Sequence, residues 1–213
     1  MLIADSLSAG YGARGVLRGI DLRIAPGEIV GITGDSGSGK TTLARTMAGL
    51  LTPTTGTVTV DGQPPRRARG AIAMVFQSPR AATNPHFTLA RIIAEPARIR
   101  RAPVPDLAAL ARAVGLTPDL LDRRPHALSD GQLQRACLAR ALAQNPRYLI
   151  LDEATAMLDA ATTATIVRLV MTRAGADLGV LLISHDEPLL EAACTRIETM
   201  REGTLSPHRA SPQ

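Results

Sequence analysis

Several residue types are scarce in this chain of 213 residues, and each scarcity excludes a class of protein. Tryptophan is absent, and two tyrosines and two phenylalanines are too few for a protein that stacks many bases of single-stranded nucleic acid. The two cysteines, Cys137 and Cys194, lack metal-ligand spacing and are typical of reduced core thiols. No run approaches the about 20 apolar residues of a transmembrane helix, and Met1–Tyr11 lacks the basic start of a secretory signal peptide.

Lysine is the scarcest charged residue. Lys40 is the only one, so the other 23 of the 24 basic residues are arginines, and with 19 acidic residues the net charge is +5. A positive balance favours an anionic partner. The arginines cluster at 66–69, 98–101 and 123–124, which indicates either ordinary solvated surface or contact with anionic lipid headgroups. Because the sequence contains no recognised nucleic-acid-binding module, we expect no nucleic-acid partner.

The hydrophobic pattern divides the chain into three parts. The first part has one helical pattern, Thr41–Leu50, among short apolar segments of strand length: Leu2–Leu7, Ile20–Ile24, Glu28–Thr33, Thr57–Val60 and Ala71–Phe76. The middle part, from about Thr88 to Asn145, has only helical patterns, at Leu89–Arg98, Leu107–Val114 and Leu133–Ala143. After Pro146, strand and helix patterns alternate, at Tyr148–Leu151, Thr162–Arg173, Gly179–Ile183, Pro188–Ala193 and Arg196–Met200.

This order predicts a single α/β domain with an insertion. Alternating strands and helices favour a mostly parallel sheet covered by helices, and Ala71–Phe76 lacks the alternation of a half-exposed strand, as expected for burial on both faces. We therefore expect an α/β core formed by residues 1–87 and 146–205, with an antiparallel β part at its start. Residues 88–145 would form an all-helical subdomain, and the polar residues 206–213 a frayed tail.

A glycine-rich loop connects a strand pattern to a helix pattern. Residues 34–41 match G-x-x-x-x-G-K-[ST], and the glycines let successive backbone amides turn toward a polyphosphate. The start of the following helix adds a partial positive charge. Lys40 would reach the β and γ phosphates of a nucleotide, and the Thr41 hydroxyl would bind Mg²⁺. The context, strand before and helix after, makes a chance match improbable.

A second acidic site follows the apolar segment Tyr148–Leu151. Neighbouring residues of a strand point to opposite faces, so Asp152 and Glu153 should have different tasks. Asp152 is placed to hold Mg²⁺, directly or through water, and Glu153 to polarise a water that attacks a γ-phosphate. Taken alone, the pair could equally be an ordinary solvated strand end.

Further motifs occur in a fixed order around these two sites. Gln77 follows a strand pattern, Leu128-Ser-Asp-Gly-Gln132 precedes the second acidic site, and Leu158-Asp159 and Ile183-Ser-His185-Asp follow it. This set resembles the ATP-binding subunit of ATP-binding cassette (ABC) transporters over roughly residues 2–205. The resemblance implies the fold of a P-loop NTPase core with an inserted helical subdomain, and MgATP as the ligand.

The resemblance also implies a role for each matching residue. Tyr11 would stack on adenine, Gln77 would lie near Mg²⁺ and the attacking water, Glu153 would be the general base, and His185 would contact the γ-phosphate. The magnesium site would comprise Thr41, Gln77 and Asp152. The nucleotide-binding residues would be Tyr11, Gly34, Asp35, Ser36, Gly37, Ser38, Gly39, Lys40, Thr41, Thr42, Ser129, Gly131, Gln132 and Asp159.

Partners follow from the same resemblance. Two ATPase subunits, identical or different, would sandwich two ATP molecules head to tail, with Ser129–Gln132 of one subunit on the γ-phosphate bound by the other. The pair would dock on integral-membrane permease subunits at the cytoplasmic face of the cell membrane, supplied indirectly by a substrate-binding protein. The segment Phe76–Pro96 resembles the branch that imports di- and oligopeptides, nickel and metal chelates.

One departure from the family pattern leaves alternatives open. Asp130 stands where the signature motif usually has glycine, and its carboxylate adds negative charge near the expected phosphate. The chain is therefore either an active transport ATPase or an ATP-binding but weakly catalytic partner in a heterodimer. A soluble, non-transport ABC ATPase is the third alternative, although such proteins usually carry two cassettes or a long coiled-coil insertion.

Overall fold

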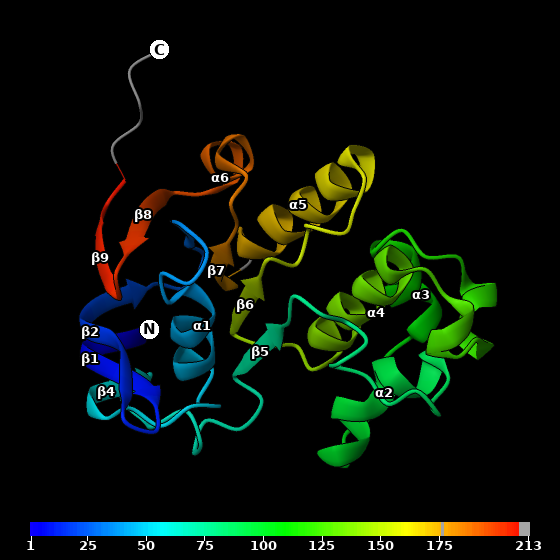
Figure 1. The fold of residues 1–213 in the computed structure, drawn as a ribbon. Helices are drawn as coiled ribbons and strands as arrows, with labels where there is room; N and C mark the ends of the chain where they lie inside the picture. Colours follow the sequence, from blue (N-terminus) through cyan, green and yellow to red (C-terminus); the bar gives the residue numbers. More distant parts are fainter. Residues whose placement is uncertain (176, 209–213) are drawn as a thin grey trace.

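The computed structural model describes residues 1–175 and 177–208, and its strands form two sheets with helices around them (Figure 1). The first sheet is antiparallel and contains β1 (Leu2–Tyr11), β2 (Arg14–Ile24) and β4 (Thr55–Val60), in the order β2-β1-β4. The turn between β1 and β2 is short enough for Tyr11 to pair directly with Arg14. This sheet is the antiparallel β part expected at the start of the chain.

The second sheet carries the C-terminal strand ends at which nucleotides bind in α/β proteins. Its order is β5-β6-β7-β3-β8-β9, and all neighbours are parallel except β8 and β9. The strands are β3 (Ile29–Thr33), β5 (Ile72–Val75), β6 (Tyr148–Asp152), β7 (Gly179–Ile183), β8 (Arg196–Arg201) and β9 (Thr204–Pro207). The mixed α/β class predicted from the sequence is confirmed.

The second sheet lies between two hydrophobic cores because alternate residues of each strand face opposite sides. In β6, Leu149 and Leu151 belong to the core shared with the helical segment, whereas Tyr148 and Ile150 belong to the core beneath the antiparallel sheet. Helix α1 (Lys40–Met47) packs within the second of these cores through Leu43. The strands that end at the candidate site are therefore fixed from both faces.

The helices between residues 89 and 143 pack on one another and on the first core. They are α2 (Leu89–Ile99), α3 (Leu107–Ala113) and α4 (Asp130–Ala143), with the short 3-10 turns η1 (Pro118–Asp122) and η2 (Pro125–Ala127). Thr88 and Asp106 cap α2 and α3 by accepting backbone N–H bonds. Two further helices, α5 (Ala160–Ala174) and α6 (Glu187–Ala193), follow β6 and β7. Within the described residues, no helix is long and apolar enough to cross a membrane.

The structure corrects several sequence-based predictions of where elements end and how deeply they are buried. Helix α1 ends at Met47 rather than Leu50, because Gly49 adopts a positive φ of 73° that terminates the helix. Strand β5 is an edge strand, so Ile72 and Met74 are only half-buried and the prediction of burial on both faces is wrong. The frayed tail predicted from residue 206 is also wrong at its start, because Ser206 and Pro207 pair with β8 in β9; residues 209–213 lie outside the described part.

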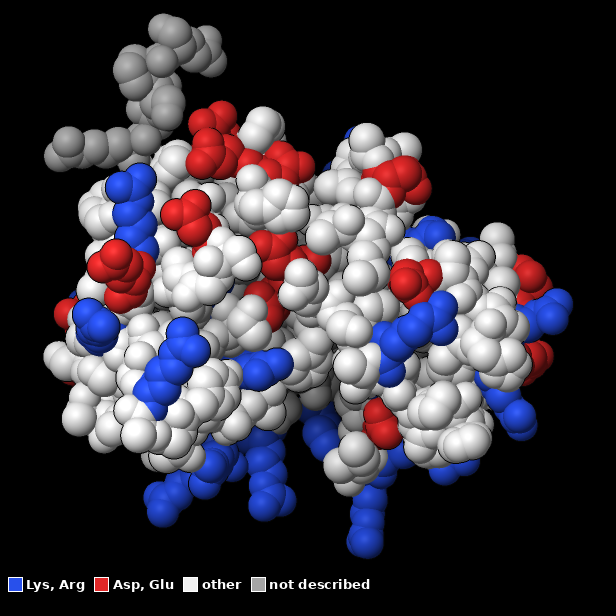
Figure 2. All heavy atoms as spheres, viewed as in Figure 1, with Lys and Arg blue, Asp and Glu red and all other residues white. Residues whose placement is uncertain are grey.

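Charge is unevenly distributed over the surface (Figure 2). Basic side chains project from the lower edge of the view, where α2 and the segment between β4 and β5 lie, and acidic side chains gather above, around α6. The guanidinium of Arg100 lies directly over Gly70 and donates to the carbonyl of Gln144. The fold thus brings together the arginine clusters at 66–69 and 98–101, and their contact with anionic lipid stays a prediction.

Candidate functional site

The glycine-rich loop joins the end of β3 to the start of α1 with backbone angles that favour glycine. Gly37 has a φ of 81° and Gly39, the residue before α1, a φ of 116°. Lys40 Nζ donates to the carbonyl oxygens of Gly34, at 2.5 Å, and Asp35, at 2.9 Å. The only lysine of the chain is therefore folded over its own loop, with its ammonium where phosphate oxygens would enter.

The loop also carries a buried polar atom without a partner. Ser38 Oγ makes no hydrogen bond to any described residue, although the side chain is buried. An unpaired buried hydroxyl costs free energy unless a ligand or water completes its bonding. Ser38 is not among the described residues that line the cavity beside Lys40, so its contact with a nucleotide stays a prediction.

The first acidic residue of the second site is buried beside the loop. Asp152 is the last residue of β6 and is only 1% exposed, and its Oδ1 accepts a hydrogen bond from Thr41 Oγ1 at 3.2 Å. Burial raises the pKa of the Asp152 carboxyl, while the Thr41 hydrogen bond opposes the rise. A hydroxyl next to a buried carboxylate is an oxygen donor set that suits Mg²⁺, so these residues fit the expected metal.

The second acidic residue turns the other way because the backbone bends after β6. Glu153 has a positive φ of 52°, which is uncommon for a non-glycine residue. Its Oε2 lies 2.8 Å from Nδ1 of His185, at the end of the neighbouring strand β7. The Glu153 side chain is only 12% exposed and that of His185 is 71% exposed, so the pair reaches the surface through His185.

One cavity of about 570 Å³ joins Lys40, Thr41, Glu153 and His185, whereas Asp152 lines a smaller cavity of about 290 Å³ that shares Thr41 and Gln77 with it. The 570 Å³ cavity is lined by Tyr11, Arg14, Val16, Gly34, Ser36, Gly37, Gly39, Lys40, Thr41, Thr42, Gln77, Glu153 and His185. Tyr11 forms its outer wall, with 46% of the residue exposed, and its hydroxyl accepts a hydrogen bond from Arg45. An adjacent cavity of about 740 Å³ shares Gly34 and His185 but contains neither Lys40 nor Thr41, so it lacks the phosphate-binding groups.

Comparison with known proteins decides the family. The sequence profile of the family described as ABC transporter matches residues 17–156, about two thirds of the chain. The chain belongs to the ABC transporter family. Its sheet topology, glycine-rich loop and acidic strand end are those of an ATP-binding cassette, and the protein is an ATPase of that family.

The chain is similar in sequence to ATP-binding proteins named for import or transport. It is 40% identical over 209 residues to the nickel import ATP-binding protein NikE of Rhodospirillum rubrum, covering 91% of this chain and 75% of that protein. It is 39% identical over 198 residues to the probable D,D-dipeptide transport ATP-binding protein DdpF of Escherichia coli, covering 89% and 62%. A dimeric cassette, MJ0796 bound to ADP and phosphate, superposes with a TM-score of 0.90 over the whole of both chains at 26% identity.

The signature residues of the cassette lie apart from its cavity. Ser129 caps α4 in a reciprocal box with Gln132, in which each side chain binds the other residue's backbone amide. Neither these residues nor Gly131 are among the described residues that line the cavity. Asp159 is also outside it, capping α5 by accepting from the amide and hydroxyl of Thr162, and these bonds lower the pKa of its carboxyl.

The signature and the segment before α5 are close to each other. A Cβ on Gly131 would lie 3.1 Å from the carbonyl oxygen of Met157. The two segments thus lie side by side, and Ser129, Gly131, Gln132 and Asp159 are not among the described residues that line the cavity.

Sequence reasoning missed several residues of the site. Arg14 and Val16 line the cavity from β2, and Arg45 orients Tyr11. The predicted strand Ile20–Ile24 did not extend back to these residues, and no local pattern marks which side chains of β2 face inward. Arg80, described below, was also missed, because its partners lie about fifty residues away in the sequence.

Proposed function

We propose that this cassette binds MgATP in the 570 Å³ cavity and hydrolyses it to drive import across the cell membrane. The observation that carries the proposal is the convergence on one cavity of three elements. These are the lysine of the glycine-rich loop, Thr41 with Asp152 hydrogen-bonded behind it, and the Glu153–His185 pair. Each element alone has an ordinary structural explanation, whereas the three together match what phosphoryl transfer to water requires.

The phosphate-binding task falls to the loop. Its backbone amides and the start of α1 would surround the β and γ phosphates, with Lys40 exchanging its loop carbonyls for phosphate oxygens. Thr41 and Asp152 would hold Mg²⁺, with Gln77 nearby, and the ion would neutralise charge on the phosphates. Tyr11 would cover the adenine ring at the outer wall.

The hydrolytic task falls to the pair at the ends of β6 and β7. Glu153 would accept a proton from the attacking water while the new bond forms at the γ-phosphorus and the bond to ADP breaks. His185 contacts the same carboxylate, so it would orient Glu153 and would lie near the γ-phosphate. The products are ADP and phosphate.

The dimer follows from the separation of signature and cavity. We infer that Ser129, Gly131, Gln132 and Asp159 complete the site of a second ATPase subunit, identical or different, arranged head to tail. The likeness to a dimeric cassette with bound ADP and phosphate supports this arrangement. ATP would then hold two subunits together, and hydrolysis would release them.

The cargo proposal rests on the relatives. The relatives NikE and DdpF are named for nickel import and D,D-dipeptide transport. We propose that this subunit works at the cytoplasmic face of a permease that takes up small peptides, nickel or a metal chelate from a substrate-binding protein. The alternative of a weakly catalytic partner rests on Asp130, and the contacts of Asp130 described below argue against it.

Purification through a tag on this chain tests the proposal. We expect a multi-span permease to co-purify and the complex to hydrolyse ATP, with Lys40→Ala abolishing hydrolysis and fluorescent-nucleotide binding. Arg67→Ala is the matched control, because this exposed arginine makes no side-chain hydrogen bond or ion pair with the described residues. Undiminished hydrolysis by Lys40→Ala would overturn the proposal, and isolation without any membrane protein would favour a non-transport ATPase.

A further inference from the structure

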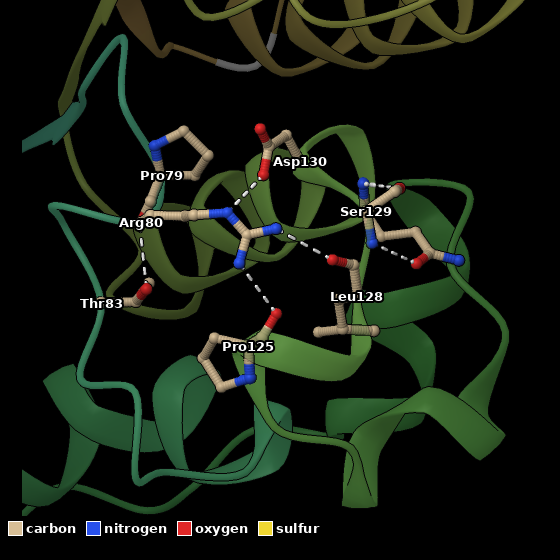
Figure 3. A network of polar contacts seen from close by, with 8 residues as sticks. Pro79, Arg80, Thr83, Pro125, Leu128, Ser129 and Asp130 are labelled. Carbon is tan, nitrogen blue, oxygen red and sulfur yellow. Dashed lines mark hydrogen bonds and ion pairs between the residues drawn. The ribbon is translucent and has the colours of Figure 1, made fainter.

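Arg80 connects the segment after β5 to the start of α4 (Figure 3). Its Nε donates to Asp130 Oδ1 at 2.6 Å, and its two terminal nitrogens donate to the carbonyl oxygens of Pro125 and Leu128, each at 3.2 Å. One guanidinium therefore binds a carboxylate and two backbone carbonyls of a segment about fifty residues away. A planar fork of five N–H donors is suited to such a site.

The partner carboxylate is the one that departs from the family pattern. Asp130 is the first residue of α4, directly after Ser129, and the capping box of Ser129 and Gln132 does not use it. Its side chain is thus free to turn away from the helix end toward Arg80 (Figure 3). The amides of Asp130 and Gly131 donate no hydrogen bond within the described part of the chain. They remain available at the positive end of the helix dipole.

A carboxylate at this position has opposite effects on folding and on anion binding. A negative charge in the first turn favours the helix. The same charge repels any phosphate that approaches the two free amides. Arg80 supplies the compensating positive charge at hydrogen-bond distance from the carboxylate.

The Arg80–Asp130 ion pair affects the electrostatic potential at the start of α4 more than it affects the stability of the fold. The side chains of Arg80 and Asp130 are 50% and 48% exposed, and ion pairs this exposed contribute little to folding. Arg80 is nevertheless well fixed, because α4 binds the segment on both sides of it. Gln134 Nε2 donates to Phe76 O at 3.0 Å, and Arg140 Nη1 donates to Ala82 O at 2.7 Å. Little ordering of Arg80 is then needed when a ligand approaches.

We propose that Arg80 is a positioning residue for the signature segment. It neutralises Asp130 and holds the carbonyls of Pro125 and Leu128, so that Ser129 and the free amides can bind the γ-phosphate of the partner subunit's ATP. The inference rests on the proposed head-to-tail dimer. It also explains how this chain tolerates aspartate where the family has glycine: the charge is compensated within the same subunit.

A four-variant cycle tests the inference: the natural pair, Arg80→Ala, Asp130→Gly, and the double variant, with Arg67→Ala as the matched control. Each is made in a Glu153→Gln background, and ATP-driven association with the co-purifying ATPase subunit, or with itself, is measured by light scattering. The kcat and KM of the complexes with Glu153 intact give a second readout. Fluorescent-nucleotide binding to the isolated chain reports its own loop.

Arg80→Ala should raise the ATP concentration for half-maximal association and the KM about ten- to hundredfold, because it leaves an unpaired carboxylate beside the phosphate. The effect should shrink in high salt, while binding by the chain's own loop stays unchanged. In the Asp130→Gly background, Arg80→Ala should have a much smaller effect, because only the bonds to the carbonyls of Pro125 and Leu128 are then lost. Arg80→Lys should recover part of the loss, since it keeps the charge without the fork.

Two results would overturn the inference. The first is an equal loss from Arg80→Ala in both backgrounds, which would make Arg80 a structural link independent of the charge. The second is no loss with the natural Asp130. If the Glu153→Gln chain with Arg80 and Asp130 intact does not associate with a second subunit when ATP is added, the proposed dimer itself is refuted.

Discussion

Glu153 Oε2 and His185 Nδ1 lie 2.8 Å apart, and this contact joins the ends of two neighbouring parallel strands at the mouth of the nucleotide cavity. The contact depends on the positive φ of Glu153, which swings the side chain out of the strand register. The two adjacent acids have different partners, as expected from the sequence, but the backbone turn after β6 and not strand alternation separates them: Asp152 faces Thr41 and Glu153 faces His185.

Glu153→Gln should lower the hydrolysis rate about 10²- to 10⁴-fold, the range for loss of a general base, because an amide cannot accept the proton of the attacking water. ATP binding should persist, since the amide still accepts a hydrogen bond from His185. Steady-state phosphate release and nucleotide-binding titration together check this. Near-normal turnover would show that another group serves as the base.

Asp152→Asn should weaken the binding of Mg²⁺ without destabilising the ligand-free chain. Burial disfavours the ionised carboxylate, as its raised pKa records, so the amide should leave the ligand-free chain equally or more stable. The same change should raise the Mg²⁺ concentration for half-maximal activity more than about tenfold. Thermal unfolding of the ligand-free chain measures the first effect, and phosphate release over a Mg²⁺ titration measures the second. Thr41→Ser, which keeps the hydroxyl, is the control, and an unaltered Mg²⁺ dependence in Asp152→Asn would refute the assignment.

The phosphate loop, the acidic strand end and the alternation of strands and helices could all be predicted from the sequence because they are local. Each of these features is marked by a short stretch of sequence: a run of glycines, an apolar segment, or a helix-capping residue such as Ser129. Strand β9 could not be predicted, since the polar residues Ser206 and Pro207 become a strand only through pairing with β8. The edge position of β5 likewise depends on the order of strands in the sheet, which local patterns do not encode.

The residues of the candidate site also divide into those that a local motif predicts and those that only the structure reveals. Asp130 was recognisable as a departure from the motif, but its consequence depended on a partner that sequence spacing does not indicate. Arg80 lies in an irregular turn, and only the packing of that turn along α4 brings the guanidinium to Asp130. Long-range pairs of charged side chains are therefore the part of this site that required the structure.

Cys194 should react with alkylating reagents slowly and with a displaced pH profile. Burial raises the pKa of its thiol to about 12, so the thiolate fraction at pH 8 is only about one in ten thousand. Since the raised pKa keeps the thiol neutral, the rate in the folded chain should climb with pH beyond 9, whereas in urea it should level off there. Mass spectrometry after timed alkylation, in a Cys137→Ala variant, gives both profiles. Levelling near pH 9 without urea would show that the thiol is accessible.

Gly34 and Gly37 should differ in their tolerance of alanine. Both have positive φ, 137° and 81°, but a Cβ on Gly34 would lie 2.2 Å from the carbonyl oxygen of Met200, whereas none is within 4 Å at Gly37. Gly37→Ala should cost about 1–2 kcal/mol of unfolding free energy from backbone strain alone. Gly34→Ala should cost more, because a backbone clash adds to the strain. Urea unfolding of both variants measures the difference, and equal costs would contradict it.

Lys40 offers a direct chemical test, because it is the only lysine in the chain. An amine-reactive reagent can modify just two groups, Lys40 Nζ and the N-terminal amine, and the latter is paired with Asp61. ATP should protect Lys40 from modification and leave the N-terminus unaffected, since only the former would contact phosphate. Peptide mass spectrometry of samples labelled with and without ATP, at matched ionic strength, resolves the two sites. Equal labelling of Lys40 in both samples would place the nucleotide elsewhere. The Tyr11→Ala variant should weaken this protection by removing the adenine contact, whereas Arg67→Ala should leave it intact.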